Sequence, residues 1–454
     1  MGNRMRTMRS LVVTAGMGLL AFLALSAAPP ASDAGATDVA PRNVIFFHPD
    51  GYGLSHWDAL RIRFVGPDGT LNWDRMPYVA PYTGHMRDGL TGTSHGGATT
   101  HAYGVKVASD SFGLDRVAPI IARSGHPLSI MEEAVQAGFA TALIQTGSLT
   151  EPGSAAFVAS VPERGDHQSI ARQVVESGVD VLFGGGERWL LPAGVSGRHG
   201  TGGRTDGLNL IQRATDLGYT VVYTREELKA IPNTATKVLG VFASGHTFND
   251  STEEALRAAG LPPYAPTAPT IAEMSAAALD ILSRNPRTAR RGFLMVAEEE
   301  GTDNFGNAAN AAGSFEAGRR ADEALGVFRQ YVGQHPRTLL ITAADSSAGS
   351  KGIVDWSDAI VGEGPANSGS DGQVSSVPLD GVDGAGTEPF RSAPDTQGNT
   401  FSFAVAWSSR SDLAGGIAAR AEGLNAERLR ELGTVDNTDI YRLMYLTLFG
   451  RWLR

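Results

Sequence analysis

The chain has 454 residues, 42% of them hydrophobic, and a formal charge of −10 at pH 7. This length and apolar content can bury a large core, in one elaborate domain or in two ordinary ones. The chain contains no cysteine, which excludes disulfides and thiolate metal sites. Its acidic balance argues against sequence-independent binding of nucleic acid, because such binding depends on basic side chains that neutralise phosphates. An anionic ligand would have to be attracted locally, by a metal ion or an arginine.

The N-terminus predicts a secretory signal peptide over residues 1–28. Three arginines precede an apolar stretch at 11–25, which is short for a membrane span, and small residues at 26–28 and 34–36 offer cleavage sites. The alternative is an uncleaved membrane anchor. Cleavage would leave the mature protein in the periplasm or outside the cell, free of the membrane and with a charge of about −13.

Seven apolar segments have the composition of buried strands, and segments with helical patterns separate them. The expected strands are 43–50, 140–145, 179–183, 237–242, 293–297, 338–342 and 401–407. Strands that alternate with helices predict an α/β fold with a doubly wound, mostly parallel sheet and helices on both faces. We expect residues 40–454 to form this domain.

Several of the intervening segments begin with a capping-box pair, in which Ser or Thr is followed three residues later by Glu. The pairs are Ser129 with Glu132, Thr224 with Glu227, and Thr270 with Glu273. Apolar faces predict helices over 271–282 and 321–332.

Residues 346–397 differ from the rest, because they are rich in Gly, Ser, Asp and Pro and show little periodicity. We expect an irregular excursion that returns to the sheet. It could cover a site, bind a structural cation or be a plain solvated loop.

Acidic residues follow three of the expected strands. Asp50 ends the first strand, Glu298 and Asp303 follow the fifth, and Asp345 follows the sixth. Ligands bind beyond the carboxyl ends of strands in such sheets. Carboxylates that converge there would repel one another unless a cation neutralised them. The alternative is a set of unrelated loop acids and helix caps.

A serine, Ser94, lies in a segment of small residues, 92–106, that continues as a helix-compatible run. Small side chains let a substrate approach the backbone closely. A helix that begins here would direct its positive N-terminal end toward an anion beside Ser94.

These motifs, in this order, resemble those of the alkaline phosphatase family. The matching segments are 43–53, which contains an Asp-Gly-Tyr-Gly turn, 93–106, 179–186, 293–303, 338–345 and 437–445. The resemblance spans roughly residues 43–449 and implies an alkaline-phosphatase-like catalytic domain.

The resemblance implies that Ser94 attacks phosphorus and forms a phosphoserine, which water then hydrolyses. Asp50 and Asp345 would hold the metal ion that activates Ser94, Asp303 would help to hold a second ion, and Glu298 a third. A serine hydroxyl is a weak nucleophile at neutral pH and needs such activation. Two cations about 4 Å apart can clamp both ends of an in-line displacement.

Arg164 falls where the family keeps its phosphate-binding arginine, and a guanidinium fork fits phosphate oxygens. Thr93 replaces an aspartate that orients this arginine, so we expect Thr93 beside the substrate. Glu151 stands at the position of a metal-linked Asp or His. A threonine ligand of the family falls on Gly153, which makes the next residue, Ser154, a candidate ligand.

The three histidines that the family supplies to its two catalytic metals are replaced in this chain. Asn307 and Ser346 stand at two of the positions, and the third falls near Asp395 or Thr396. Nitrogen donors therefore give way to oxygen donors. Zinc favours nitrogen and sulfur, whereas magnesium and calcium favour oxygen. We expect divalent ions, with magnesium, calcium or manganese at one or both catalytic positions. Zinc held more weakly is the alternative.

Three histidines of the chain's own lie near these residues. His48, His95 and His101 flank Asp50 and Ser94, as ligands or as structural residues.

The resemblance implies a secreted phosphomonoesterase that acts on small phosphate monoesters through a phosphoserine, and that forms a homodimer as relatives often do. A phosphodiesterase or sulfatase of the same superfamily is an alternative, although the chain has no cysteine to mature into the nucleophile of a sulfatase. A non-catalytic relative that binds phosphate or metal is the other.

Overall fold

The computed structural model describes residues 40–355, 379–381 and 389–454, all within the unit Ala40–Arg454. The expected signal peptide, 1–28, lies outside the described residues. No helix within the described ranges is long and apolar enough to cross a membrane.

Ten strands of the described ranges form one sheet in the order β16-β2-β15-β8-β1-β7-β3-β4-β6-β5. The run from β8 to β5 is parallel, and β15 is antiparallel to β8 and β2. The predicted mostly parallel α/β sheet is confirmed. The strands are β1 (Asn43–Pro49), β2 (Tyr78–Thr83), β3 (Ala140–Ser148), β4 (Val181–Gly185), β5 (Thr220–Val222), β6 (Val238–Val241), β7 (Phe293–Glu299), β8 (Thr338–Thr342), β15 (Ala418–Gly423) and β16 (Val435–Asp436).

Side chains of β1 alternate between two hydrophobic cores, one on each face of the sheet. Val44 and Phe46 belong to one core, and Ile45 and Phe47 to the other. Strand side chains point to opposite faces in turn, so a strand covered on both faces has a continuous apolar sequence.

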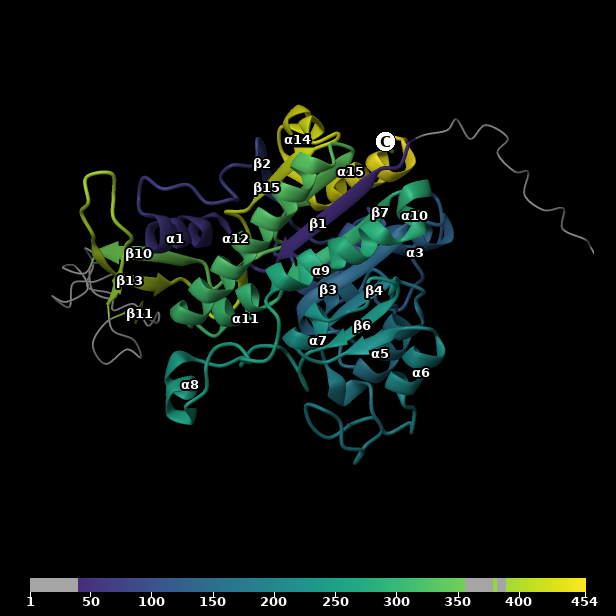
Figure 1. The fold of residues 1–454 in the computed structure, drawn as a ribbon. Helices are drawn as coiled ribbons and strands as arrows, with labels where there is room; N and C mark the ends of the chain where they lie inside the picture. Colours follow the sequence, from purple (N-terminus) through teal and green to yellow (C-terminus); the bar gives the residue numbers. More distant parts are fainter. Residues whose placement is uncertain (1–39, 356–378, 382–388) are drawn as a thin grey trace, which may run out of the picture. The chain divides into compact units, whose positions relative to one another are not determined.

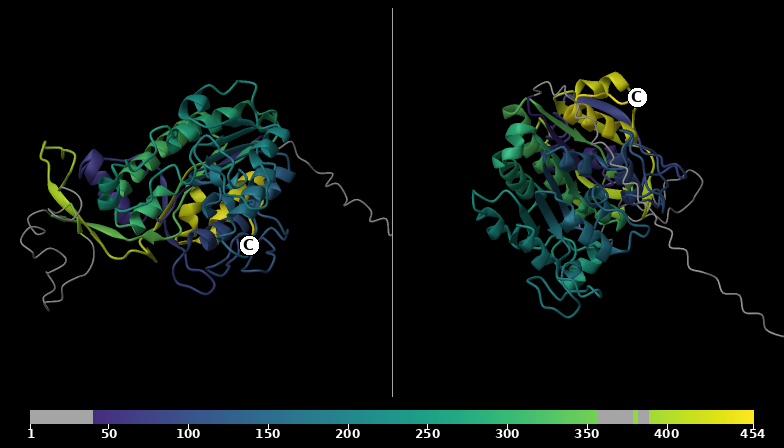
Figure 2. Two further views of the ribbon diagram at one scale, coloured as in Figure 1. Left: turned by 90° about the horizontal axis from the view of Figure 1, so that it is seen from below. Right: turned by 90° about the vertical axis from the view of Figure 1, so that its right-hand side faces the viewer.

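Helices cover both faces of this sheet (Figure 1). One face carries α1 (Leu54–Val65), α9 (Ile271–Arg284) and α12 (Ala311–Gln334). The other carries α2 (Ser94–Tyr103), α3 (Ile130–Gln136), α5 (His167–Glu176) and α15 (Asn437–Phe449). In Figure 2 the green α12 and the yellow α15 lie on opposite sides of the strands. The remaining helices are η1 (Glu187–Trp189), α4 (Pro152–Ala155), α6 (Leu210–Asp216), α7 (Arg225–Lys229), α8 (Glu253–Ala259), α10 (Pro286–Arg290), α11 (Gly301–Asn307) and α14 (Glu427–Leu432).

The apolar segment 401–407 forms a strand, but not in the main sheet. It is β13 (Ser402–Trp407), which pairs antiparallel with β10 (Lys351–Asp355), β11 (Leu379–Asp380) and β12 (Phe390–Arg391). A buried strand pattern does not specify its partner, which explains the wrong assignment.

The expected irregular excursion, 346–397, also contains strands where it is described. Besides β10, β11 and β12 it includes β9 (Ser347–Ala348), which pairs with β14 (Asp412–Leu413). Three of these strands have only two residues. Such short strands give no periodicity, so the sequence alone could not reveal them.

Two of the predicted capping boxes, at Ser129 and Thr270, form both of their hydrogen bonds. At the third, Thr224 accepts from the backbone of Glu227 at 3.1 Å, but the Glu227 carboxylate accepts from the Tyr223 N–H at 2.7 Å.

Replacing Thr270 with alanine removes the oxygen that accepts from Glu273 N at 3.2 Å. We expect the free energy of unfolding to fall by about 1 kcal/mol. Urea denaturation followed by circular dichroism measures this. Thr270→Ser keeps the oxygen and serves as the control, and equal losses in both variants would contradict the assignment of the cap.

Candidate active site

The carboxyl ends of three neighbouring strands bring together the predicted acidic residues. β1 pairs with β7 on one side and with β8 on the other, with His48 opposite Glu298 and Phe47 opposite Thr342. This register places Asp50, Glu298 and Asp345 at the same edge of the sheet, and all three are at most 1% exposed. The prediction that they meet at one edge of the sheet is confirmed.

The oxygens of these three carboxylates have no hydrogen-bond partner among the described residues. Burial, and then the charge of Asp50, raises the pKa of Glu298 to about 8 and that of Asp345 well above its usual range. Three buried carboxylates without donors fit a site for divalent cations, which prefer oxygen ligands.

His48 faces this group from β1. Its Nδ1 lies 2.8 Å from the Ala343 carbonyl oxygen, so this nitrogen donates and Nε2 points the other way. Nε2 lies 3.2 Å from Asp50 Oδ1 and 4.0 Å from Asp345 Oδ1. Ligand atoms of His48, Asp50 and Glu298 all lie within 4.8 Å of one another, a spacing that one metal ion could bridge. His48 is therefore a candidate ligand.

Ser94 is the first residue of α2 and is 5% exposed. Burial alone would raise the pKa of Asp50. This pKa is nevertheless lowered, first by His48 and then by polar contacts that include Ser94. A Cβ at Gly97 would lie 2.7 Å from Asp345 Cβ, so only a glycine lets the first turn of α2 approach Asp345 this closely. The small residues after Ser94 thus allow α2 to begin directly against the carboxylates.

Thr93, which is expected beside the substrate, is the N-cap of α2. Its Oγ1 accepts from Gly96 N at 3.2 Å and donates to the Ser109 carbonyl oxygen at 2.6 Å. Because its hydroxyl both accepts and donates a hydrogen bond, Thr93 fixes the first turn of α2 and thereby the position of Ser94.

A second cluster lies at α11. The Asn307 Nδ2 donates to both oxygens of Asp303 at 3.1 Å and to Asp412 Oδ1 at 3.0 Å. Burial, and then Asp412, raises the pKa of Asp303 well above its usual range. A Cβ at Gly51, which has φ 62°, would lie 2.5 Å from Asp303 Oδ1, so this cluster adjoins the turn after Asp50.

The sequence did not point to Asp412 as a candidate metal ligand. The third histidine position of the family was placed near Asp395. Asp395 lies outside the cluster, in an exposed turn where its carboxylate accepts from Gln397 N (2.9 Å), Asn399 N (2.7 Å) and Asn399 Nδ2 (3.0 Å). Ser346 is fully buried and in polar contact with Asp412. The signal that could have identified Asp412 is its place just beyond the apolar strand β13.

A third group surrounds Glu298. Arg164 Nη2 lies 3.0 Å from Glu151 Oε2, and a Cβ at Gly153 would overlap Glu298 Oε1. Burial lowers the pKa of Arg164, but Glu151 and then Glu300 raise it more. The structure thus joins Glu151 and Arg164. Ser154 lies beside them but accepts a hydrogen bond from Gln145 Nε2 at 2.6 Å.

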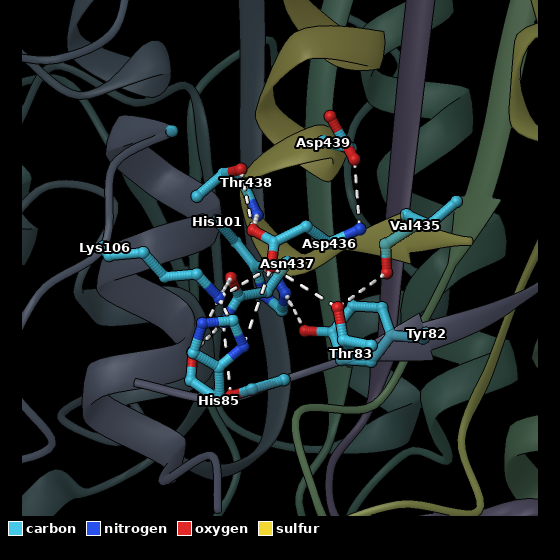
Figure 3. A network of polar contacts seen from close by, with 12 residues as sticks. Tyr82, Thr83, His85, His101, Lys106, Val435, Asp436, Asn437, Thr438 and Asp439 are labelled. Atoms are coloured by element: carbon cyan, nitrogen blue, oxygen red, sulfur yellow. Dashed lines mark hydrogen bonds and ion pairs between the residues drawn. The ribbon is translucent and has the colours of Figure 1, made fainter. Parts of the chain in front are cut away.

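His101 has a structural role. Its Nε2 lies 2.8 Å from the Tyr82 hydroxyl, and Figure 3 shows the two side chains turned toward each other. In the same network Lys106 Nζ donates to Asn437 Oδ1 at 2.7 Å and to Asp436 Oδ2 at 2.8 Å, which ties the segment after α2 to the start of α15.

His95 has a buried Nδ1 without a hydrogen-bond partner among the described residues.

If cations neutralise these carboxylates, their removal should destabilise the fold. We expect EDTA to lower the melting temperature and added Mg²⁺, Mn²⁺ or Ca²⁺ to restore it. An ion at a hundred times its Kd stabilises by about 2.7 kcal/mol per site. Differential scanning calorimetry measures the shift, with NaCl at equal ionic strength as the control. A melting temperature indifferent to every divalent ion would contradict the cation sites.

Comparisons with known proteins agree with this geometry. Residues 41–448 match the sequence model of the family described as "Alkaline phosphatase". Alkaline phosphatase of Escherichia coli (strain K12) is 27% identical over 354 residues, which cover 69% of this chain and 72% of that protein. Streptomycin-6-phosphate phosphatase of Streptomyces griseus is 29% identical over 366 residues, which cover 72% and 78%.

The fold has solved counterparts as well. The crystal structure of Thermus thermophilus alkaline phosphatase has a TM-score of 0.66 and 25% sequence identity, and covers 94% of this chain and 96% of that one. Because the family match runs from just before β1 into α15, we conclude that the chain belongs to the alkaline phosphatase family.

Proposed function

We propose that this hydrolase of the alkaline phosphatase family cleaves small phosphate monoesters and depends on divalent metal ions. The observation that carries the proposal is the position of Ser94, which is buried at the start of α2 and helps to lower the pKa of the buried Asp50. Asp345 lies against the same helix turn. A hydroxyl beside buried carboxylates that need cations is a nucleophile in a setting that can activate it.

Ser94 Oγ would attack phosphorus and lose its proton, the bond from phosphorus to the leaving oxygen would break, and the alcohol would depart. Water would then cleave the phosphoserine and release inorganic phosphate. The N-terminus of α2 favours the negative charge beside Ser94. Bound divalent cations would lower the pKa of the serine hydroxyl and the water, and offset charge on the leaving oxygen.

Arg164 would bind the phosphoryl group. Its side chain is 42% exposed and only one of its nitrogens is held, by Glu151 at 3.0 Å. The rest of the guanidinium fork is free of Glu151 and has the geometry that phosphate oxygens require. Glu151 would therefore orient the arginine toward Ser94.

The cations would occupy three positions. Asp50 and Asp345, with His48, would hold the first, and Asp303, Asn307, Ser346 and Asp412 the second. Glu298 and Glu151 would hold the third, for which magnesium is the best candidate. The second set offers oxygen donors only, which supports magnesium, calcium or manganese over zinc there. Secretion to the periplasm or the medium and a homodimer remain predictions of the sequence.

The first test is hydrolysis of p-nitrophenyl phosphate at alkaline pH. We expect chelated protein to be inactive and to recover when magnesium, calcium or manganese is added, and Ser94→Ala to lower kcat at least about 1000-fold. Ser283→Ala, an exposed serine on α9, is the matched control. Full activity of Ser94→Ala would exclude the serine mechanism. Hydrolysis of diesters or sulfate esters alone would transfer the assignment to those reactions.

The choice of metal has a test of its own. We expect protein purified without chelator to contain magnesium, calcium or manganese, measured by inductively coupled plasma mass spectrometry. Replacing both Asn307 and Asp412 by histidine supplies nitrogen donors and should increase the zinc content after equilibration with equal zinc and magnesium. Stoichiometric zinc at the Asp303 cluster of the unaltered protein would contradict the oxygen-ligand hypothesis.

A further inference from the structure

Three consecutive glutamates stand where β7 meets α11, with Glu298 and Glu299 at the end of the strand and Glu300 as the first residue beyond it. The Glu299 carboxylate accepts from Thr146 Oγ1 and from the Tyr264 hydroxyl, both at 2.7 Å, and from Gly301 N at 3.2 Å. All three bonds fall on Oε1, so this oxygen of Glu299 has its own donors and supports the packing of Tyr264, whereas Oε2 has no hydrogen-bond partner among the described residues.

Glu298 and Glu300 lack such donors. Both oxygens of Glu298 and Oε2 of Glu300 have no hydrogen-bond partner among the described residues, although the two residues are 0% and 1% exposed. The two carboxylates are in polar contact with each other.

The end of β3 and the start of α4 approach this pair closely. A Cβ at Gly147, in β3, would lie 2.9 Å from Glu151 Cγ and 3.1 Å from Glu300 Cγ, and a Cβ at Gly153, in α4, would overlap Glu298 Oε1. Glu151, Glu298 and Glu300 therefore all face the backbone between Gly147 and Gly153.

The positive and negative side chains around Glu298 and Glu300 do not balance in charge. Arg164 pairs with Glu151, and His48 pairs with Asp50, so neither ion pair includes Glu298 or Glu300. Buried carboxylates without donors or a counter-ion are strongly unfavourable. A divalent cation with several oxygen ligands would supply the missing positive charge.

Position 153 shows why this chain would need an additional ligand. The resemblance places a threonine ligand there, but the residue is glycine, and the space a side chain would need is filled by the Glu298 carboxylate. The third site thus lacks one oxygen donor, and Glu300 has an unpartnered one beside it.

We propose that Glu300 is a ligand of the divalent cation held by Glu298 and replaces the oxygen that Gly153 cannot provide. This role rests on the proposed metal-dependent function. It is supported by the burial of Glu298 and Glu300, by their unpartnered oxygens and by their close approach to Gly153 and Gly147.

Glu300→Gln tests the proposal, with Glu299→Gln as the matched control one residue away. Each full-length mature protein is stripped with EDTA and titrated with Mg²⁺ alone by isothermal titration calorimetry. We expect Glu300→Gln to lose one binding event or to weaken it at least about 10-fold. Glu299→Gln should keep every binding event, because its carboxylate already has three donors.

Melting temperatures separate a ligand from a structural residue. Without divalent ions, Glu300→Gln should melt no lower than the unaltered protein, since the change removes one of two repelling charges, and it should gain less from Mg²⁺. Glu299→Gln should melt lower in both conditions, because it disrupts the bonds to Thr146 and Tyr264.

Unchanged Mg²⁺ affinity in Glu300→Gln would overturn the assignment of Glu300, whatever the activity. Protein that binds Mg²⁺ through Glu300 but hydrolyses no phosphate monoester would instead overturn the proposed function. Absence of Mg²⁺ binding in the unaltered protein would overturn both.

Discussion

Electrostatic repulsion among buried carboxylates is the constraint on which the rest of the site depends. Parallel pairing of β1 with β7 and β8 forces Asp50, Glu298 and Asp345 to one edge of the sheet, where His48 Nε2 lies 3.2 Å from Asp50 but the oxygens of Glu298 and Asp345 have no hydrogen-bond partner among the described residues. Two continuous hydrophobic cores on opposite faces of the sheet supply the stability that offsets this repulsion. The fold therefore tolerates an arrangement that its own polar groups leave uncompensated, which is characteristic of a site built for cations.

Glycine allows the three clusters to stand so close together. At Gly51, Gly97 and Gly153 a Cβ would clash with Asp303, Asp345 and Glu298 in turn. Each glycine belongs to a different element, so α2, α4 and the turn after Asp50 all approach the carboxylates at backbone distance. Asn307 adds a short side chain that bridges Asp303 and Asp412.

Local patterns predicted what depends on local sequence. The strands β1, β3, β4, β6, β7 and β8, two capping boxes and the acids at strand ends were all recognisable, because each follows from residues adjacent in the chain. The position of Asp412 beside Asp303 was not recognisable, because the pairing of β14 with β9 decides it after a long excursion. Asp395 was an equally suitable candidate in the sequence. β2 was missed for a related reason, since Pro81 within it disfavours a strand, and its pairing with β15 and the two-residue β16 depends on residues far away in the chain.

The bond between Asn307 and Asp412 spans 105 residues, and its length has a consequence for how the protein folds. Closing so long a loop costs conformational entropy that only later contacts recover, so pairings of this kind form slowly. The β8–β1–β7 edge joins residues still farther apart, since Asn43 bonds to Thr338 across 295 residues and to Phe293 across 250. A newly made chain would therefore acquire neither cation position until most of its length has been synthesised and paired.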